Sequence, residues 1–119
     1  MDLAEFGASA EREKEVRVVV PGTAPEVRTP IWIVNVKGLA YVRSYKAEEG
    51  HWYQSVRKAR RFVLEIAGTD VAVVAEPVAD TDLLAEVSDA YRTKYAGEAE
   101  TPDMVTDVVT ATTLRLTPT

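Results

Sequence analysis

Short runs of β-branched residues, each closed by a tight turn, constrain the fold of this chain more than any other feature. The densest run covers residues 31–36 and is typical of a β-strand. Lys37-Gly38 then supplies a two-residue turn, and residues 39–45 are typical of a returning strand. The sequence therefore predicts an antiparallel hairpin over residues 31–45.

The remaining pattern predicts several more strands and a few helices. Strands are expected at residues 15–20, 62–66, 71–76 and 111–117. Helices are expected at residues 2–14, 50–61 and 80–95. Because short turns join most strands, we expect an α+β fold with a small, partly open antiparallel barrel and flanking helices. We expect one domain over residues 1–119, with an N-terminal helix at 1–14 and the barrel core at 15–119.

Composition excludes several classes of site. The chain has no cysteine and one histidine, His51, so we expect no metal site. The first residues lack a basic, apolar leader, and no apolar run has membrane-spanning length, so we expect a cytoplasmic protein without a membrane segment.

Charge is unevenly spread along the chain. The net charge of −5 argues against nucleic-acid binding. Residues 16–61 nevertheless carry nine basic and three acidic side chains. Either an anion site lies in this segment, or the basic and acidic segments pair with each other across the fold.

Polar and basic side chains are expected to gather at the open end of the hairpin. With the turn at residues 37–38, facing positions would pair Trp32 with Arg43, Ile31 with Ser44, Pro30 with Tyr45 and Thr29 with Lys46. The resulting cluster has three cations and two hydroxyls: Arg28, Thr29, Arg43, Ser44 and Lys46. Such a set suits a phosphate group. The alternative is a cation–π pair of Trp32 with Arg43 and protective charges on a sheet edge.

Both faces of the hairpin carry apolar residues. Ile31, Ile33 and Val42 share one face, and Trp32 and Tyr41 share the other. One face is expected in the barrel core, and the other is expected under a helix, a ligand or a second subunit. No catalytic acid or base can be named, because His51 has no evident partner that would tune it.

Four motifs carry a resemblance to a known family. They are RTPIW at 28–32, YVRS at 41–44, AYRTKY at 90–95 and TLRL at 113–116. Together, from about residue 15 onward, they resemble an uncharacterised bacterial family of the FMN-binding split-barrel group. Relatives there are pyridoxamine-phosphate-oxidase-like proteins and deazaflavin-dependent reductases.

The resemblance implies a homodimeric, flavin-dependent oxidoreductase that uses FMN or a deazaflavin on a small-molecule substrate. On the matching positions, Arg28 and Arg43 would bind the phosphate, and Thr29, Ser44 and Lys46 would support it. Trp32 or Trp52 would pack near the ring. The chain departs from flavin-binding relatives because no Asn-Pro segment follows the third strand. The alternative is a non-enzymatic binding domain that has kept the fold and lost the flavin.

Overall fold

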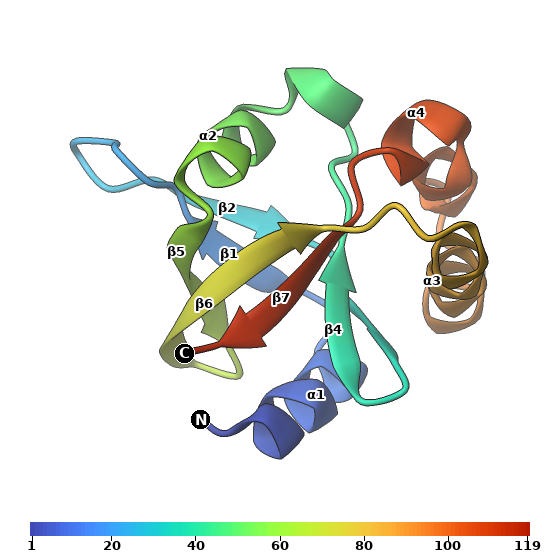
Figure 1. The fold of residues 1–119 in the computed structure, drawn as a ribbon, viewed down its shortest axis with the longest axis horizontal. Coiled ribbons are helices and arrows are strands. Elements are labelled where there is room, and N and C mark those ends of the chain that lie inside the picture. Colours follow the sequence, from blue (N-terminus) through green and yellow to red (C-terminus); the bar gives the residue numbers. More distant parts are fainter.

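The computed structural model describes residues 1–119 and shows an α+β fold built on one antiparallel sheet (Figure 1). The order of the seven strands is β2-β1-β5-β6-β7-β4-β3. The strands are β1 Val16–Val19, β2 Arg28–Ile31, β3 Val34–Val36, β4 Leu39–Val42, β5 Arg61–Ile66, β6 Thr69–Pro77 and β7 Leu114–Pro118. This confirms the predicted fold class.

Helices flank the sheet on several sides. The α-helices are α1 Leu3–Arg12, α2 His51–Ala59, α3 Thr81–Lys94 and α4 Asp107–Thr110, and the 3-10 helices are η1 Ala47–Glu49 and η2 Thr101–Val105. The three predicted long helices are thus confirmed within a few residues. The turn that follows the short helix α4 occupies the start of the strand predicted at 111–117, so β7 begins only at Leu114. No helix is long and apolar enough to cross a membrane.

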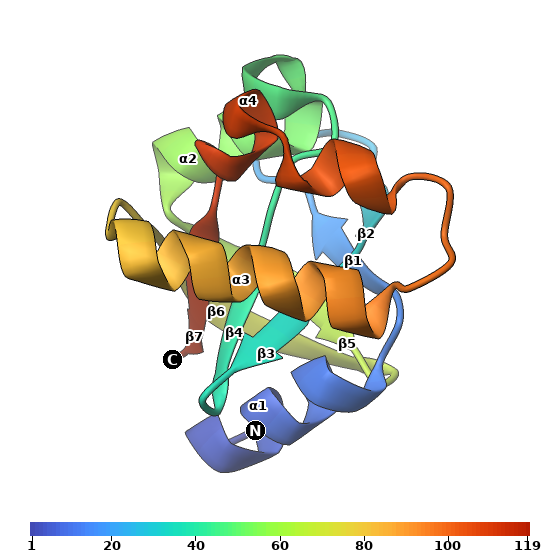
Figure 2. The ribbon, with the colours of Figure 1, turned by 90° about the vertical axis from the view of Figure 1, so that its right-hand side faces the viewer.

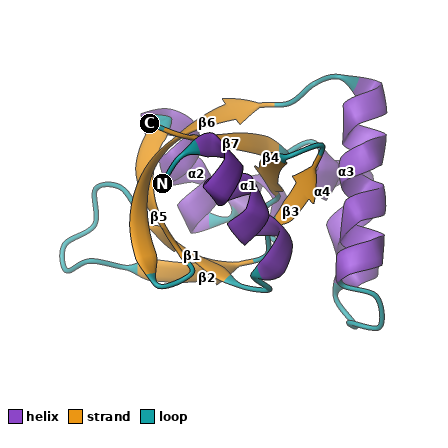
Figure 3. Cartoon of the chain, turned by 90° about the horizontal axis from the view of Figure 1, so that it is seen from below, coloured by secondary structure: helices purple, strands orange, loops and turns teal.

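The sheet curls into a half-barrel, and its two faces are covered differently. Figure 3 shows the strands curving around α1, while α3 stands outside the curl. The inner face holds a cluster of twenty buried residues, among them Phe6, Ile33 and Leu64. The outer face of β3 and β4 holds a smaller cluster with Val34, Tyr41 and side chains of α3. Figure 2 shows α3 crossing in front of these strands. The predicted second face of the hairpin is therefore covered by a helix.

The turn at Lys37-Gly38 is confirmed. Both residues have positive φ, 53° and 86°, as a two-residue type I′ turn requires. Val36 pairs with Leu39, and Val34 pairs with Tyr41. Glycine fits the second position because it adopts positive φ without steric cost.

Beyond Val34 the predicted hairpin pairing is wrong. The chain leaves β4 at Trp32-Ile33, and β2 pairs with β1 instead, with Ile31 opposite Val16 and Arg28 opposite Val19. The backbone of Ile33 is satisfied by α3 rather than by a strand. Its N–H donates to the Tyr95 hydroxyl at 3.1 Å, and its carbonyl accepts from Lys94 Nζ at 2.8 Å. These bonds satisfy buried polar groups where the ladder stops.

Gly7 lies inside α1 because the helix packs against the hairpin turn. A Cβ at position 7 would overlap the Gly38 carbonyl. The Asn35 side chain also donates to the Gly7 carbonyl at 2.7 Å. A residue that weakens an isolated helix is therefore needed for this close contact.

Candidate functional site

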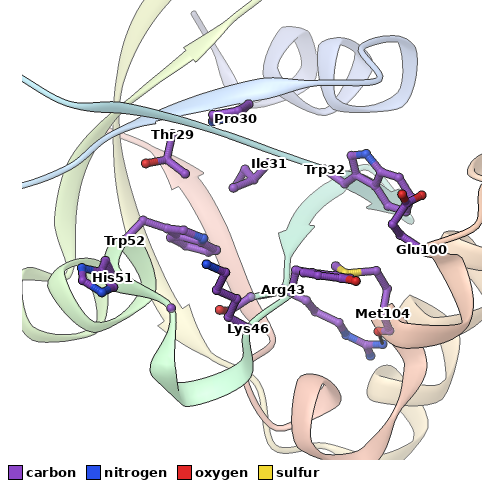
Figure 4. A pocket seen from close by; sticks show the side chains of 13 residues that line it. Thr29, Pro30, Ile31, Trp32, Arg43, Lys46, His51, Trp52, Glu100 and Met104 are labelled. Atoms are coloured by element: carbon purple, nitrogen blue, oxygen red, sulfur yellow. Dashed lines mark hydrogen bonds between the residues drawn. The ribbon is translucent and has the colours of Figure 1, made fainter.

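A cavity lies where the half-barrel is open, between the end of β2 and the segment that follows β4 (Figure 4). The start of α2 and the helix η2 complete its walls. Its volume is about 740 Å³, which is within the range of small-molecule sites. Thirteen residues line it: Thr29, Pro30, Ile31, Trp32, Arg43, Ser44, Tyr45, Lys46, Gly50, His51, Trp52, Glu100 and Met104.

The cavity collects every predicted site residue except Arg28. Thr29 and Trp32 come from β2 and the residue after it, and Arg43, Ser44 and Lys46 follow β4. The predicted pairings between these segments are wrong, yet both segments still border one space, because β2 and β4 diverge at Trp32-Ile33. The predicted pairing would have left no space between the two segments, whereas their divergence leaves room for the cavity.

Arg28 lies outside the cavity wall, in a cluster of carboxylates. Its guanidinium donates to Asp70 at 2.7 and 3.0 Å, to Glu65 at 2.8 Å and to Glu26 at 3.0 Å. Bonding to Asp70, and then to Glu26 and Glu65, raises the pKa of Arg28 above its ordinary value. The structure thus separates Arg28 from the other predicted site residues and gives its charge three protein partners.

Arg43 borders the cavity, but its guanidinium is buried and turned toward α3 and η2. It donates to the hydroxyls of Thr113 and Ser88, both at 2.8 Å, and to the carbonyls of Met104 and Leu84, both at 3.0 Å. Its exposed fraction is 1%. Burial lowers the pKa of Arg43, and none of its bonding partners is a carboxylate. Arg43 therefore ties three segments together instead of presenting its donors to the cavity.

One end of the cavity, at Ser44 and the start of α2, gathers hydrogen-bond donors and is termed the anion end. Ser44 Oγ is fully buried and has no hydrogen-bond partner. It faces Gly50, the N-cap of α2, and a Cβ at position 50 would overlap it. No side chain caps α2, so its first N–H groups have no side-chain partner, and the positive end of its dipole lies at this end of the cavity.

Two more polar side chains complete this anion end. Lys46 is exposed, makes no ion pair and lies beside Trp52 in Figure 4. The Thr29 hydroxyl is half-buried on the opposite wall. An ammonium, two hydroxyls and a helix N-terminus form a donor set that suits phosphate.

Aromatic side chains form the apolar walls. Trp52 is buried on the anion side, and its ring meets that of Tyr53 edge-on at 6.0 Å. Trp32 stacks on Tyr95 on the other side, with ring centroids 3.9 Å apart and planes 3° from parallel. A flat ring system can therefore meet an indole on either side of the cavity.

Sequence reasoning missed the η2 side of the site. Glu100, Met104 and Tyr45 line the cavity there, and the Tyr45 hydroxyl donates to Asp103 at 3.3 Å. The negative charge of Asp103, with its hydrogen bond, raises the pKa of Tyr45, and Glu100 adds to the effect. Glu100 and Met104 are more than fifty positions from the hairpin, and no local pattern indicates their approach. Gly50 did carry a signal, because it is the first residue of the helix predicted at residues 50–61. No cluster of His, Asp and Glu side chains that could hold a metal ion is present.

Comparison with known proteins identifies the fold and the family. The structure is similar to the conserved hypothetical protein Rv2991 from Mycobacterium tuberculosis, with a TM-score of 0.62 and 17% identity over 98% of this chain and 78% of that one. A second solved structure gives a TM-score of 0.50 and 16% identity over the same shares. At these identities the similarity shows the fold alone. No curated protein matches the sequence. Residues 2–116 match the family described as an uncharacterized protein conserved in bacteria (DUF2255), and the chain belongs to that family.

Proposed function

We propose that the cavity binds a flavin, either FMN or a deazaflavin, and that the protein is a flavin-dependent oxidoreductase of the split-barrel type. The observation that carries this proposal is the buried, unpartnered hydroxyl of Ser44 beside the uncapped N-terminus of α2. A buried hydroxyl without a partner loses free energy, which a ligand that bonds to it restores.

The residues of the anion end would hold the phosphate. Lys46 would supply charge, Ser44 and Thr29 would supply hydroxyls, and the first N–H groups of α2 would complete the shell. Gly50 keeps the helix start close to Ser44 because it has no side chain. Arg43 would act from behind, holding the segment before Ser44 against α3 and η2.

The indoles would position the ring system. Trp52 lies beside the anion end and Trp32 lies toward η2 (Figure 4), so the apolar walls run between the two ends of the cavity. When bound, the flavin supplies the hydride chemistry, and the protein supplies orientation and charge.

Homodimerisation is part of the same proposal. The sequence argument for it assumed that Trp32 and Tyr41 are exposed. Tyr41 is only 2% exposed because α3 covers it, and Trp32 is half-buried and stacks on Tyr95. The two most exposed large apolar side chains are instead Tyr45, at 52%, and Val108, at 65%, and these are candidates for a contact between subunits. Light scattering at twice the chain mass would support the dimer, and the mass of a single chain would contradict it.

A second candidate function has its own supporting observation. Two expected phosphate ligands, Arg28 and Arg43, are saturated by protein groups. This favours a non-enzymatic domain that has lost the flavin and binds another small anion at the start of α2. Both candidates use the same anion end, so a cofactor titration separates them.

The test compares FMN with riboflavin, which lacks the phosphate, by absorption and fluorescence titration; a deazaflavin is titrated in parallel. We expect FMN to bind more tightly than riboflavin. Lys46→Met and Ser44→Ala should each weaken FMN binding by about tenfold or more without changing riboflavin binding, since each removes a contact to the charged group. Lys58→Met is the matched control, because Lys58 is an exposed lysine of α2 that does not line the cavity.

The possible outcomes have distinct meanings. If the Lys46 and Ser44 variants bound FMN as tightly as the unsubstituted protein does, the phosphate assignment would be contradicted. A protein that binds neither FMN nor the deazaflavin would contradict the flavin proposal. If inorganic phosphate still bound in a Lys46-dependent way, the second candidate would stand.

A further inference from the structure

The end of the cavity at η2 differs in charge from the anion end. Glu100 is the only carboxylate among the lining residues, and it lies beside Trp32 and opposite His51 and Trp52 in Figure 4. The cavity thus has a cationic end at Lys46 and an acidic end at Glu100, with indoles along its length. A ligand that uses both ends carries an anion at one end and a cation at the other.

Glu100 has no protein partner for its charge. Its side chain makes no hydrogen bond and no ion pair, whereas the nearby Glu98 pairs with Lys14 at 3.2 Å and Asp103 accepts from Tyr45. Glu100 is the N-cap residue of η2, and its backbone carbonyl accepts from Asp103. Its position is therefore set by the main chain, and its carboxylate is available to a ligand.

Trp32 adds a second feature that favours a cation. Tyr95 covers one face of the indole, and the Tyr95 ring is itself held by hydrogen bonds to Lys14 and Ile33. Trp32 itself lines the cavity, beside Glu100 in Figure 4. A fixed indole face beside a carboxylate is a favourable site for an ammonium group.

Other charged groups besides Lys46 lie near this end. The Lys94 ammonium lies 5.4 Å from the centroid of the Tyr95 ring, but it donates to the carbonyls of Ala10, Glu13 and Ile33. Asp103 reinforces the preference for a cation, and Lys46 lies at the opposite end of the cavity. Arg43 is the cation packed behind Met104, where protein oxygens accept from all three of its guanidinium nitrogens. Because these bonds already use its donors, Arg43 does not offer them to the cavity.

We infer that the η2 end of the cavity binds the ammonium group of an organic amine, with Glu100 and Trp32 as the residues that select it. This names the class of molecule that shares the cavity with the flavin, and its role as a substrate rests on the proposed function. Binding of the amine itself does not require the flavin.

The experiment uses the chain without flavin and two matched probes. Phenethylamine and 2-phenylethanol differ in carrying an ammonium or a hydroxyl. Their affinities are measured by NMR titration of the two indole N–H signals. We expect phenethylamine to bind about tenfold more tightly, with the larger shift at Trp32. Glu100→Gln should abolish the preference, and Glu98→Gln, which removes a nearby acid outside the cavity, should preserve it.

The inference would be overturned by equal affinity for both probes, by a preference that survives Glu100→Gln, or by no binding of phenethylamine. A shift confined to Trp52 would also overturn it, because the amine would then lie at the other end. Amine selection in a protein that fails to bind FMN would leave this inference standing and remove the flavin proposal. FMN binding without amine selection would do the reverse.

Discussion

Arg28 and Arg43 begin from the same expectation, as two cations for one phosphate, and the structure places them in opposite environments. Arg28 lies at the surface among Asp70, Glu65 and Glu26. Arg43 is buried under α3, and its partners are two hydroxyls and two carbonyls. One arginine is neutralised by charges, and the other is solvated by neutral oxygens.

The difference shows that a basic residue near a site is not yet a ligand. Carboxylates at the surface bind Arg28 in a medium where such pairs contribute little to stability. Arg43 is out of water, so each oxygen that bonds to it replaces lost hydration. We therefore expect the region of Arg43 to respond strongly to substitution and that of Arg28 to respond weakly.

The largest effect should follow from removing the buried guanidinium. Arg43→Met leaves the Ser88 and Thr113 hydroxyls and two carbonyls without their donor, which should lower the free energy of unfolding by about 3–5 kcal/mol. Urea unfolding followed by circular dichroism measures this loss. Arg43→Lys, which keeps the charge but reaches fewer acceptors, should lose less; a Met variant as stable as the parent would break the comparison.

Alkaline pH should destabilise the same region. Burial raises the pKa of Tyr95 from 10.0 to about 12, and it raises the pKa of Tyr91 still further. A phenol with a raised pKa in the folded state contributes stability that is complete below pH 10 and is lost as the pH rises through the folded value. Lys94 acts in the opposite sense, because burial lowers its pKa from 10.5 to about 8. Its contribution to the free energy of unfolding therefore increases as the pH rises from about 8 to 10.5.

Thermal unfolding as a function of pH separates the two tyrosines. The Tyr91 hydroxyl is buried without a hydrogen bond, so Tyr91→Phe should leave stability at neutral pH unchanged or slightly higher. Above pH 10, the same variant should lose less stability with rising pH than the unsubstituted protein does. An identical alkaline profile in Tyr91→Phe would mean that the buried phenol does not titrate with unfolding.

A single acceptor of Arg43 should have an intermediate effect. Ser88→Ala removes one hydrogen bond to a charged group and should cost about 1.5–3 kcal/mol, measured by urea unfolding. Ser55→Ala serves as a helix control, because Ser55 lies in α2 and makes no side-chain hydrogen bond. Equal losses in the two variants would indicate a helix effect instead of a contribution from Arg43.

The smallest effect should come from Arg28. Arg28→Ala should lower the unfolding midpoint only slightly, and the difference should shrink in concentrated salt because the pairs are exposed to solvent. A loss as large as that of Arg43→Met would remove the contrast between the two arginines. Loss of FMN binding in Arg28→Ala would show that the residue acts on the cavity despite its position.

Parts of the site were predictable because they follow from local pattern. The turn at Lys37-Gly38 and the alternation around it correctly predicted a returning strand that begins at Leu39. That strand ends at Val42, so Ser44, which was predicted inside it, and Lys46 both follow it at the cavity. The pairing of Thr29 with Lys46 was wrong, since it assumed a ladder that continues past Val34. Glu100 and Met104 were absent from the prediction, because η2 reaches the cavity only through the packing of α3 and the segment after it.

The sequence by itself determined most of the strands, the long helices, the hairpin turn and the antiparallel α+β class. These features depend on side-chain period and on residues that tolerate turns. Tertiary structure decided where the strand over residues 31–36 breaks and what Arg28 and Arg43 bind. Tyr95 and Lys94 satisfy the backbone of Ile33 from 62 and 61 positions away. A buried polar group takes whichever partner the whole fold brings within reach, and no local window of sequence contains that partner.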